Sequence, residues 1–390
     1  MNENDMLKEL DAAWVMPTYR RDLALVRGEG CRVWDADGRA YLDFMAGIAV
    51  CNTGHCHPAV VEAIRGQAGK LMHASNLFLN EWQPRLAEKI SGISLGGKVF
   101  FCNSGAEANE CLFKLARKWG SAEGRYEIIT MRNSFHGRTL ATMTATGQTK
   151  YQKGFEPLVP GFAYADFNDL ASVRAAVTDR TVAVLVEAVQ GEGGILPATE
   201  EFMTGLRALC DERRLLMLCD EVQCGIGRTG KWFGWQNYPV KPDAFSMAKG
   251  LGGGFPIGAA TATPALSDVL QPGNHASTFG GTPLACAASY AALSAIEDER
   301  MLDNALARGE QLRAGLRDLA ARHPAIRDVR GLGLMVGLEL DAPAAPVAAK
   351  LREAGLLCIP TGQSVLRFVP PLVVTEAEVA QALAILDATL

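Results

Sequence analysis

One lysine of this 390-residue chain has surroundings that suit chemistry better than solvation. Lys249 lies in Ser246-Met-Ala-Lys249-Gly-Leu-Gly-Gly-Gly254, among small and apolar residues and before a glycine-rich loop. Removal from water lowers the pKa of a lysine and makes its amine a good nucleophile toward carbonyl compounds. Taken alone, the stretch is also compatible with an ordinary buried lysine.

Two other features add parts of a site. Asp220 closes the apolar run Leu215-Leu-Met-Leu-Cys-Asp220, where a carboxylate suits a metal ligand, a general base or a partner for a cation. Ser104-Gly105-Ala106 opens a predicted helix, whose free N–H groups and dipole suit a phosphate, although no P-loop lysine follows. A Schiff-base lysine, a carboxylate for a pyridinium nitrogen and a phosphate turn together indicate pyridoxal phosphate.

The elements around these residues predict an α/β fold. Apolar strands are expected at Val99–Cys102, Thr181–Glu187 and Leu215–Asp220. Helices are expected at Ala106–Trp119, with Ser104 as N-cap and Glu107 completing a capping box, and at Glu200–Arg214. Fully apolar strands alternating with helices favour a mainly parallel sheet that binds ligands at its carboxyl ends.

The pattern changes after residue 286. A long helical stretch runs to about Arg322, short β segments follow, and a terminal helix begins at Glu376, which predicts a smaller α+β domain. Residues 26–44 are expected to form two short strands with a turn at 35–38, packed on that domain. We therefore divide the chain into an N-terminal segment (1–55), a large cofactor-binding domain (56–286) and a small domain (287–390).

Composition excludes several other classes. The net charge of -5 and scattered basic residues favour neither nucleic acid nor membrane as a partner. The polar start, the lack of any long apolar run and ten cysteines without a C-x-x-C pair favour free thiols in the cytoplasm. His55-Cys56-His57 favours a structural turn, so no metal is expected. The glycines at 250–254 lack dinucleotide-loop spacing, which disfavours a nicotinamide oxidoreductase.

Six motifs occur in the order seen in one family. They are Asn103-Ser-Gly-Ala-Glu-Ala-Asn109, Ser134-Phe-His-Gly-Arg-Thr139, Gln190-Gly-Glu-Gly-Gly194, Asp220-Glu-Val-Gln-Cys-Gly-Ile-Gly-Arg-Thr-Gly230, Ala248-Lys249-Gly and Ser277-Thr-Phe-Gly-Gly281. From about Arg27 to about Val374 the chain resembles the class III pyridoxal-phosphate aminotransferases, most of all those that act on N2-acetylornithine. The resemblance implies fold type I, with a large domain and a smaller α+β domain.

The resemblance also implies the cofactor contacts. Lys249 is expected to carry the cofactor as a Schiff base and later to act as general base, with Asp220 pairing to the pyridinium nitrogen. The remaining contacts are the phosphate turn Ser104, Gly105 and Ala106, Phe135 and Val222 on the two ring faces, Gln223 on the phenolic oxygen, and Thr278 reaching the phosphate of a partner subunit. The active site would then require a homodimer.

Substrate contacts follow from the same resemblance. Arg138, with Ser277 beside it, is expected to grip a substrate carboxylate by two points, which suits arginine geometry. Arg367 is expected to pair with Glu192 while the ω-amino substrate is bound, and to be freed for the α-carboxylate of glutamate. A purely structural ion pair is the alternative.

The implied reaction is transamination of N2-acetyl-L-ornithine with 2-oxoglutarate, giving N-acetylglutamate semialdehyde and L-glutamate in arginine biosynthesis. N-succinylornithine, N-succinyl-diaminopimelate and ornithine remain alternative substrates, and a non-catalytic binding protein with this fold is the alternative from another class.

Three positions depart from the pattern. Ala188 and Thr282 stand where proline and asparagine are usual, and Ile48 replaces the tyrosine of ornithine aminotransferases, which argues against free ornithine. Tyr19 is a candidate for the entrance, and no role is assigned to Glu187.

Overall fold

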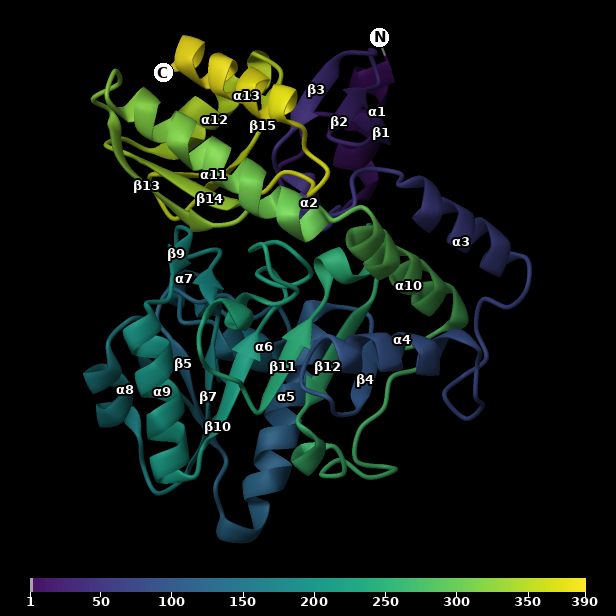
Figure 1. Cartoon of the computed structure of the whole chain (residues 1–390), viewed down its shortest axis with the longest axis vertical. Coiled ribbons are helices and arrows are strands. Elements are labelled where there is room, and N and C mark those ends of the chain that lie inside the picture. Colours follow the sequence, from purple (N-terminus) through teal and green to yellow (C-terminus); the bar gives the residue numbers. More distant parts are fainter. Residues whose placement is uncertain (1–2) are drawn as a thin grey trace.

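The computed structural model describes residues 3–390 and is built on a central seven-stranded sheet (Figure 1). In spatial order the strands are β4 (Val99–Cys102), β12 (Gly258–Ala262), β11 (Ala244–Met247), β10 (Leu216–Asp220), β7 (Thr181–Val186), β5 (Glu127–Met131) and β6 (Phe162–Ala165). The strand β10 pairs in parallel with both β7 and β11, whereas β12 runs antiparallel to β11 and β4. The predicted α/β fold with a mainly parallel sheet is confirmed, with β12 as its one antiparallel member.

Both faces of this sheet are covered by helices, which explains its apolar strands. Ala183 and Leu185 of β7 pack with the helix α5 (Gly105–Gly120), while Val184 and Val186 face the opposite core together with α9 (Glu200–Arg213). Alternate side chains of a strand point to opposite faces, so a strand buried on both sides must be apolar throughout. The predicted helices at 106–119 and 200–214 are confirmed.

The start of α5 is fixed by its cap. Ser104 has an extended backbone, and its Oγ accepts a hydrogen bond from the Glu107 N–H at 3.2 Å. The Glu107 carboxylate accepts from the Asn103 N–H at 2.7 Å, one residue earlier than in the predicted capping box. The predicted N-cap is confirmed, and the reciprocal contact is shifted by one residue because the carboxylate reaches past the cap.

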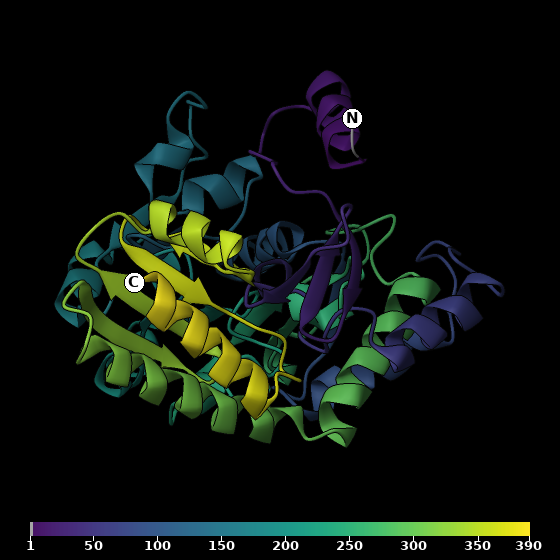
Figure 2. The ribbon, with the colours of Figure 1, turned by 90° about the horizontal axis from the view of Figure 1, so that it is seen from above.

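The C-terminal part forms a second sheet beside the first one. Its strands lie in the order β13 (Ile326–Leu332), β14 (Met335–Leu340), β17 (Val365–Phe368) and β16 (Ile359–Thr361), and its helices are α11 (Met301–Ala320), α12 (Ala344–Glu353) and α13 (Glu376–Thr389). Figure 2 shows α11 and α13 side by side. The predicted single helical stretch to Arg322 is wrong, since Arg300, with φ +53°, separates α11 from α10 (Pro283–Asp298).

The N-terminal segment joins this C-terminal part through a third sheet. The strands β1 (Leu25–Glu29), β2 (Arg32–Asp35) and β3 (Ala40–Asp43) form it together with β15 (Leu356–Leu357), which pairs with β3. This part of the chain has three strands rather than the expected two, because it also turns at Gly30-Cys31. The predicted boundary after residue 286 falls inside α10, which packs on α3 and α4, so the domain division stays a prediction and the break at Arg300 favours a later boundary.

Shorter elements complete the chain. They are α1 (Glu3–Trp14), α2 (Ala46–Ala49), α3 (Pro58–Ala68), α4 (Trp82–Gly92), α6 (Leu140–Ala145), α7 (Thr149–Gln152), α8 (Leu170–Ala176), the pair β8 (Val189–Gln190) and β9 (Leu196–Pro197), and the 3-10 turns Ser121–Glu123, Gly234–Asn237, Lys249–Gly252 and Pro264–Leu266. Within residues 3–390, no helix combines the length and apolar character needed to cross a membrane.

The His55-Cys56-His57 motif is structural. His55 Nε2 lies 2.6 Å from Asp43 Oδ2, and His57 Nε2 lies 3.0 Å from Glu299 Oε1. The two rings therefore serve different partners, and no metal-binding cluster of histidine, cysteine or carboxylate side chains occurs among the described residues.

A buried cation joins the three parts of the fold. Arg228, fully buried in the loop after β10, donates from Nη1 to the carbonyl oxygens of Leu334 and Pro370 and from Nη2 to Asn52 Oδ1 at 2.7 Å. Burial lowers the pKa of Arg228, so its charge depends on these oxygens. The large sheet, the C-terminal part and the N-terminal segment therefore meet at one guanidinium group.

Replacement of this arginine tests the junction. Arg228→Met should lower the free energy of unfolding by about 3–6 kcal/mol, because three buried oxygens lose their donors. Chemical denaturation of the variant and of the wild type measures the difference. Arg85→Met, which removes a surface ion pair with Glu81, is the control and should leave stability unchanged. Equal effects of the two substitutions would contradict the assigned role.

Candidate active site

A cavity of about 340 Å³ opens at the carboxyl ends of β7, β10 and β11 and at the start of α5. Most of the predicted cofactor residues line it, namely Ser104, Gly105, Ala106, Phe135, Asp220, Val222, Gln223 and Lys249. Residues that the sequence did not assign line it too, among them Asn109, His136 and Glu187. The carboxyl ends of the strands are where open parallel sheets bind their ligands.

The start of α5 forms an anion site in one wall of the cavity. Gly105 and Ala106 are its first two residues, and the N–H groups at this position of a helix have no intrahelical acceptor. A side chain at residue 105 would clash, since its Cβ would lie 2.7 Å from Val222 Cγ1. The glycine therefore lets the helix end approach Val222 closely, and the free N–H groups and helix dipole suit a phosphate.

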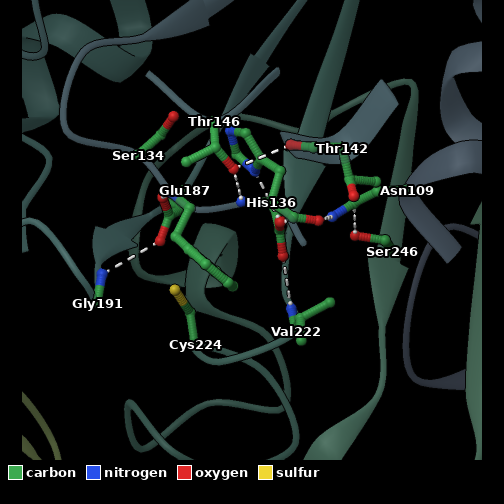
Figure 3. Close-up of polar contacts among 12 residues, drawn as sticks. Asn109, Ser134, His136, Thr142, Thr146, Glu187, Gly191, Val222, Cys224 and Ser246 are labelled. Carbon is green, nitrogen blue, oxygen red and sulfur yellow. Dashed lines mark hydrogen bonds and ion pairs between the residues drawn. The ribbon is translucent and has the colours of Figure 1, made fainter. Parts of the chain in front are cut away.

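The Asp220 carboxylate is held by Asn109, His136 and Val222, which are labelled in Figure 3. Its Oδ2 accepts hydrogen bonds from Asn109 Nδ2 and His136 Nδ1, both at 2.8 Å, and its Oδ1 accepts from the Val222 N–H at 3.0 Å. Asp220 is only 3% exposed. These three donors fix the orientation of the buried carboxylate, which can accept from a cationic nitrogen in the cavity.

Asn109 is in turn fixed from the next strand. The hydroxyl of Ser246, in β11, donates to Asn109 Oδ1 at 2.7 Å, and Asn109 Nδ2 also donates to the His136 carbonyl oxygen. Asn109, His136 and Ser246 were not predicted as site residues from the sequence. A usable signal existed for Asn109, which lies four residues after Gly105 and therefore on the same face of the helix.

Lys249 follows β11 and begins a short 3-10 turn with a backbone φ of +45°. This conformation is uncommon for a residue with a side chain and persists only where the surroundings enforce it. Burial lowers the pKa of Lys249, and the nearby charge of Arg367 lowers it further, against the opposing effect of Glu192, Asp220 and Glu187. The amine is thus closer to its neutral, nucleophilic form than a solvated lysine.

Arg367, Glu192 and Gln223 meet in one buried cluster. Arg367 Nη1 donates to Glu192 Oε1 at 2.5 Å and to Gln223 Oε1 at 3.0 Å, and Arg367 is 1% exposed. Burial alone would raise the pKa of Glu192, but the charge and hydrogen bond of Arg367 outweigh it and lower that pKa. With its oxygen engaged, Gln223 keeps its amide N–H groups available to an acceptor in the cavity.

Arg138 lies outside the cavity lining, on an exposed face. Its guanidinium stands 4.2 Å from the ring centre of Tyr151 and 5.4 Å from that of Phe135. Stacking on Tyr151 leaves its N–H edge free for a carboxylate. Arg138 and Phe135 therefore belong to one segment that contacts the cavity and presents a cation beside it.

Ser277 and Thr278 are not part of the lining of this cavity. Ser277 Oγ accepts from the Gly280 N–H at 3.0 Å and from Asn103 Nδ2 at 3.3 Å, and no contact with Arg138 is formed among the described residues. Thr278 lines a separate hollow with His73 and Asn76. The expected position of Ser277 beside Arg138, and the contact of Thr278 with the phosphate of a partner subunit, therefore stay predictions.

The departures from the family pattern have local explanations. Thr282 caps α10, as its Oγ1 accepts from the Ala285 N–H at 3.4 Å. Ile48 belongs to a left-handed turn at 46–49, with φ +69°, and does not line the cavity. Tyr19 is 71% exposed and is not part of the cavity lining, so its role at the entrance stays a prediction.

The cavity suits a ligand with a phosphate at one end and a protonated ring nitrogen at the other. Free N–H groups at a helix start suit phosphate, the Asp220 carboxylate suits a protonated ring nitrogen, and Lys249 supplies an amine. Phe135 and Val222 provide apolar contact for a ring. The residues present therefore fit pyridoxal phosphate.

Comparisons with known proteins agree with this chemistry. The family model for class-III aminotransferases matches residues 15–390. The acetylornithine aminotransferase of Caldanaerobacter subterraneus subsp. tengcongensis is 54% identical over 379 residues, 96% of each chain. That of Gloeobacter violaceus is 52% identical and covers 96% of this chain and 94% of its own.

Solved structures are similar over the whole chain. An ornithine aminotransferase from Toxoplasma gondii has a TM-score of 0.96 at 33% identity and covers all of this chain and 95% of its own. The acetylornithine aminotransferase from Elizabethkingia anophelis has a TM-score of 0.89 at 34% identity, covering 100% and 99%. This chain belongs to the class III aminotransferases, enzymes of fold type I that use pyridoxal phosphate.

Proposed function

We propose that this aminotransferase moves the side-chain amino group of N2-acetyl-L-ornithine to 2-oxoglutarate, giving N-acetylglutamate semialdehyde and L-glutamate in arginine biosynthesis. The carrying observation is the ion pair of buried Arg367 with partly buried Glu192, whose Nη1 and Oε1 lie 2.5 Å apart beside Gln223. A buried guanidinium needs an anion at every stage, so Glu192 can leave it only when another carboxylate replaces it. That requirement fits an enzyme that alternates between an ω-amine and a dicarboxylate.

The choice of acetylornithine rests on the relatives. Acetylornithine aminotransferases from several organisms are 46–54% identical to this chain, whereas the ornithine aminotransferase from Toxoplasma gondii is 33% identical. Ile48 also stands where ornithine aminotransferases resemble one another in having tyrosine. Both points favour an acylated α-amino group over a free one, and leave the identity of the acyl group to experiment.

The two half-reactions assign roles to the residues. Pyridoxal phosphate, when bound, would supply an electron sink for the substrate carbon. Asp220, held by Asn109 and His136, would pair with its ring nitrogen. Lys249 would supply the amine that holds the cofactor and would act as general base toward the proton on the substrate carbon. Its lowered pKa favours the neutral form that this proton transfer needs.

Carboxylate recognition distinguishes the two substrates. Arg138 binds the α-carboxylate of acetylornithine while Arg367 stays paired with Glu192. With glutamate, Arg138 binds the γ-carboxylate and Arg367 the α-carboxylate, because both substrates must present their reacting carbon to Lys249. Because the two arginines have a fixed separation, they favour dicarboxylates of one length.

The site is completed by a second copy of the chain. Residues 71–79, between α3 and α4 at the right of Figure 1, expose Leu77, Phe78 and Leu79, and Phe279 lies beside them at 63% exposure. Asn76 Nδ2 bonds this segment to the carbonyl oxygens of Ser277 and Gly280, at 2.9 and 2.8 Å. An apolar surface of this kind is typical of an interface, and it carries Thr278, which we propose reaches the phosphate of the partner. We place the enzyme in the cytoplasm, because all ten cysteines are free.

The lysine assignment is tested chemically. Purified protein should be yellow, and borohydride should fix the cofactor on a peptide that contains Lys249. Lys249→Ala should lose at least about 10³-fold in turnover, since both its nucleophile and its general base are removed. Peptide mass spectrometry and turnover measure the two effects. A colourless protein, or a label on another lysine, would refute the assignment.

Substrate preference is tested by comparing kcat/KM for N2-acetylornithine, N-succinylornithine, N-succinyl-diaminopimelate and ornithine, each with 2-oxoglutarate. Acetylornithine should exceed ornithine by at least about tenfold, because a pocket built for an amide leaves a charged ammonium unpaired. A higher value for succinylornithine would change the acyl group and keep the reaction. A higher value for ornithine would contradict the interpretation of Ile48.

The dimer is tested on its apolar surface. Wild-type protein should sediment at about twice the chain mass of 41.7 kDa. The double variant Leu77→Asp/Leu79→Asp should sediment as a monomer and bind pyridoxal phosphate at least about tenfold more weakly, since buried charges oppose association. Leu306→Asp, at an exposed leucine on α11, is the control and should remain dimeric. A dimeric double variant would contradict the proposed interface.

A further inference from the structure

Glu187 is a cavity-lining carboxyl group for which the reaction above has no use. It follows β7 directly and is 4% exposed. A buried carboxyl group without a cation partner is costly, and a structure keeps one only where its hydrogen bonds matter. Its partners therefore indicate its purpose.

The two oxygens of Glu187 join two separate segments of the site. Oε1 accepts from the Phe135 N–H and Oε2 from the Gly191 N–H, both at 3.1 Å, and Figure 3 shows the second bond. The first segment, residues 135–138, carries the stacking ring and Arg138. The second, residues 190–194, carries Glu192, the partner of Arg367. One carboxylate thus connects the two groups that handle substrate carboxylates.

The second segment has little freedom to move in other directions. A side chain at Gly191 would clash, because its Cβ would lie 2.3 Å from Gln223 Nε2. On its other side, Thr361 Oγ1 donates to the carbonyl oxygens of Gly191 and Glu192, at 3.2 and 3.0 Å. Glu187, at the end of β7, accepts from the Gly191 N–H. Residues 190–194 are therefore held by the large sheet on one side and by the C-terminal part on the other.

The raised pKa of Glu187 makes glutamine a suitable replacement, because glutamine resembles the neutral carboxyl group. Burial raises its pKa to about 7, and Asp220 raises it too, although His136 and the two N–H donors lower it. The neutral form is therefore accessible in the folded protein near neutral pH, and Glu187→Gln imitates that form in shape and charge. The amide keeps one acceptor oxygen but presents an NH2 group to the other backbone N–H.

We propose that Glu187 is a positioning residue that sets the distance between Arg138 and the Arg367–Glu192 pair, and so determines how well the enzyme holds a dicarboxylate. The inference rests on the proposed function, in which glutamate uses both arginines and acetylornithine uses Arg138 alone. A shift between the two segments then weakens two-point binding much more than one-point binding, because only the former depends on their separation.

Unreactive ligands test this separation without turnover. Glutarate is a five-carbon dicarboxylate, and valerate is a monocarboxylate of the same length. Titration calorimetry on the holoenzyme should give Glu187→Gln at least a tenfold higher Kd for glutarate and a Kd for valerate within about threefold of wild type. Kinetics should agree, with kcat/KM falling at least tenfold more for glutamate than for acetylornithine.

Glu221→Gln is the matched control. Glu221 is equally buried, its carboxylate accepts two backbone N–H groups, from Gly234 and Trp235, at 2.6 and 2.8 Å, and burial raises its pKa to about 8. Its bonds fix the 3-10 turn at 234–237, which carries neither arginine. This variant should lose as much thermal stability as Glu187→Gln and bind glutarate like wild type.

The outcomes separate the two levels of inference. Equal glutarate affinity in wild type and Glu187→Gln, or an equal loss in Glu221→Gln, would overturn the role of Glu187. If wild-type protein itself binds glutarate no better than valerate, the proposed use of two arginines fails, and the inference about Glu187 fails with it.

Discussion

The active site depends on holding one buried carboxylate in place. Asp220 stands at the end of β10 and is only 3% exposed, so its oxygens must be satisfied by neighbouring hydrogen-bond donors. These donors come from Asn109 on α5 and from His136 after β5. In the sheet, β7 lies between β5 and β10. This strand order and the packing of α5 on the sheet bring His136 and Asn109 to the same carboxylate.

Local signals in the sequence were sufficient for much of the large sheet. Apolar strands at 99–102, 181–187 and 215–220 and the Ser104 cap were predictable, because each depends on neighbours a few residues away. The antiparallel β12 and the third N-terminal strand were not, since strand direction and pairing depend on contacts far along the chain. The break at Arg300 was missed because a left-handed arginine has no sequence signature.

Site residues divide along the same line. Lys249 and Asp220 attract attention because their residue types conflict with apolar surroundings, and the family resemblance added Phe135, Arg138 and Arg367. His136 and Asn109 were not predicted as site residues, because histidine and asparagine also occur commonly on protein surfaces. Their partner lies 84 and 111 residues away, respectively. The supporting groups of a site are thus less visible in a sequence than the groups they support.

The Arg228 junction limits how the protein can be divided. Its guanidinium is satisfied by oxygens from residues 52, 334 and 370, which no single contiguous fragment of the large sheet contains. A truncated chain that ends before the second sheet would bury an arginine with two of its three acceptors missing. If the two halves are expressed separately, the half with Arg228 buries a guanidinium that lacks most of its acceptors. Fragment complementation or circular permutation must therefore keep Arg228 and its acceptor oxygens together from the beginning of folding.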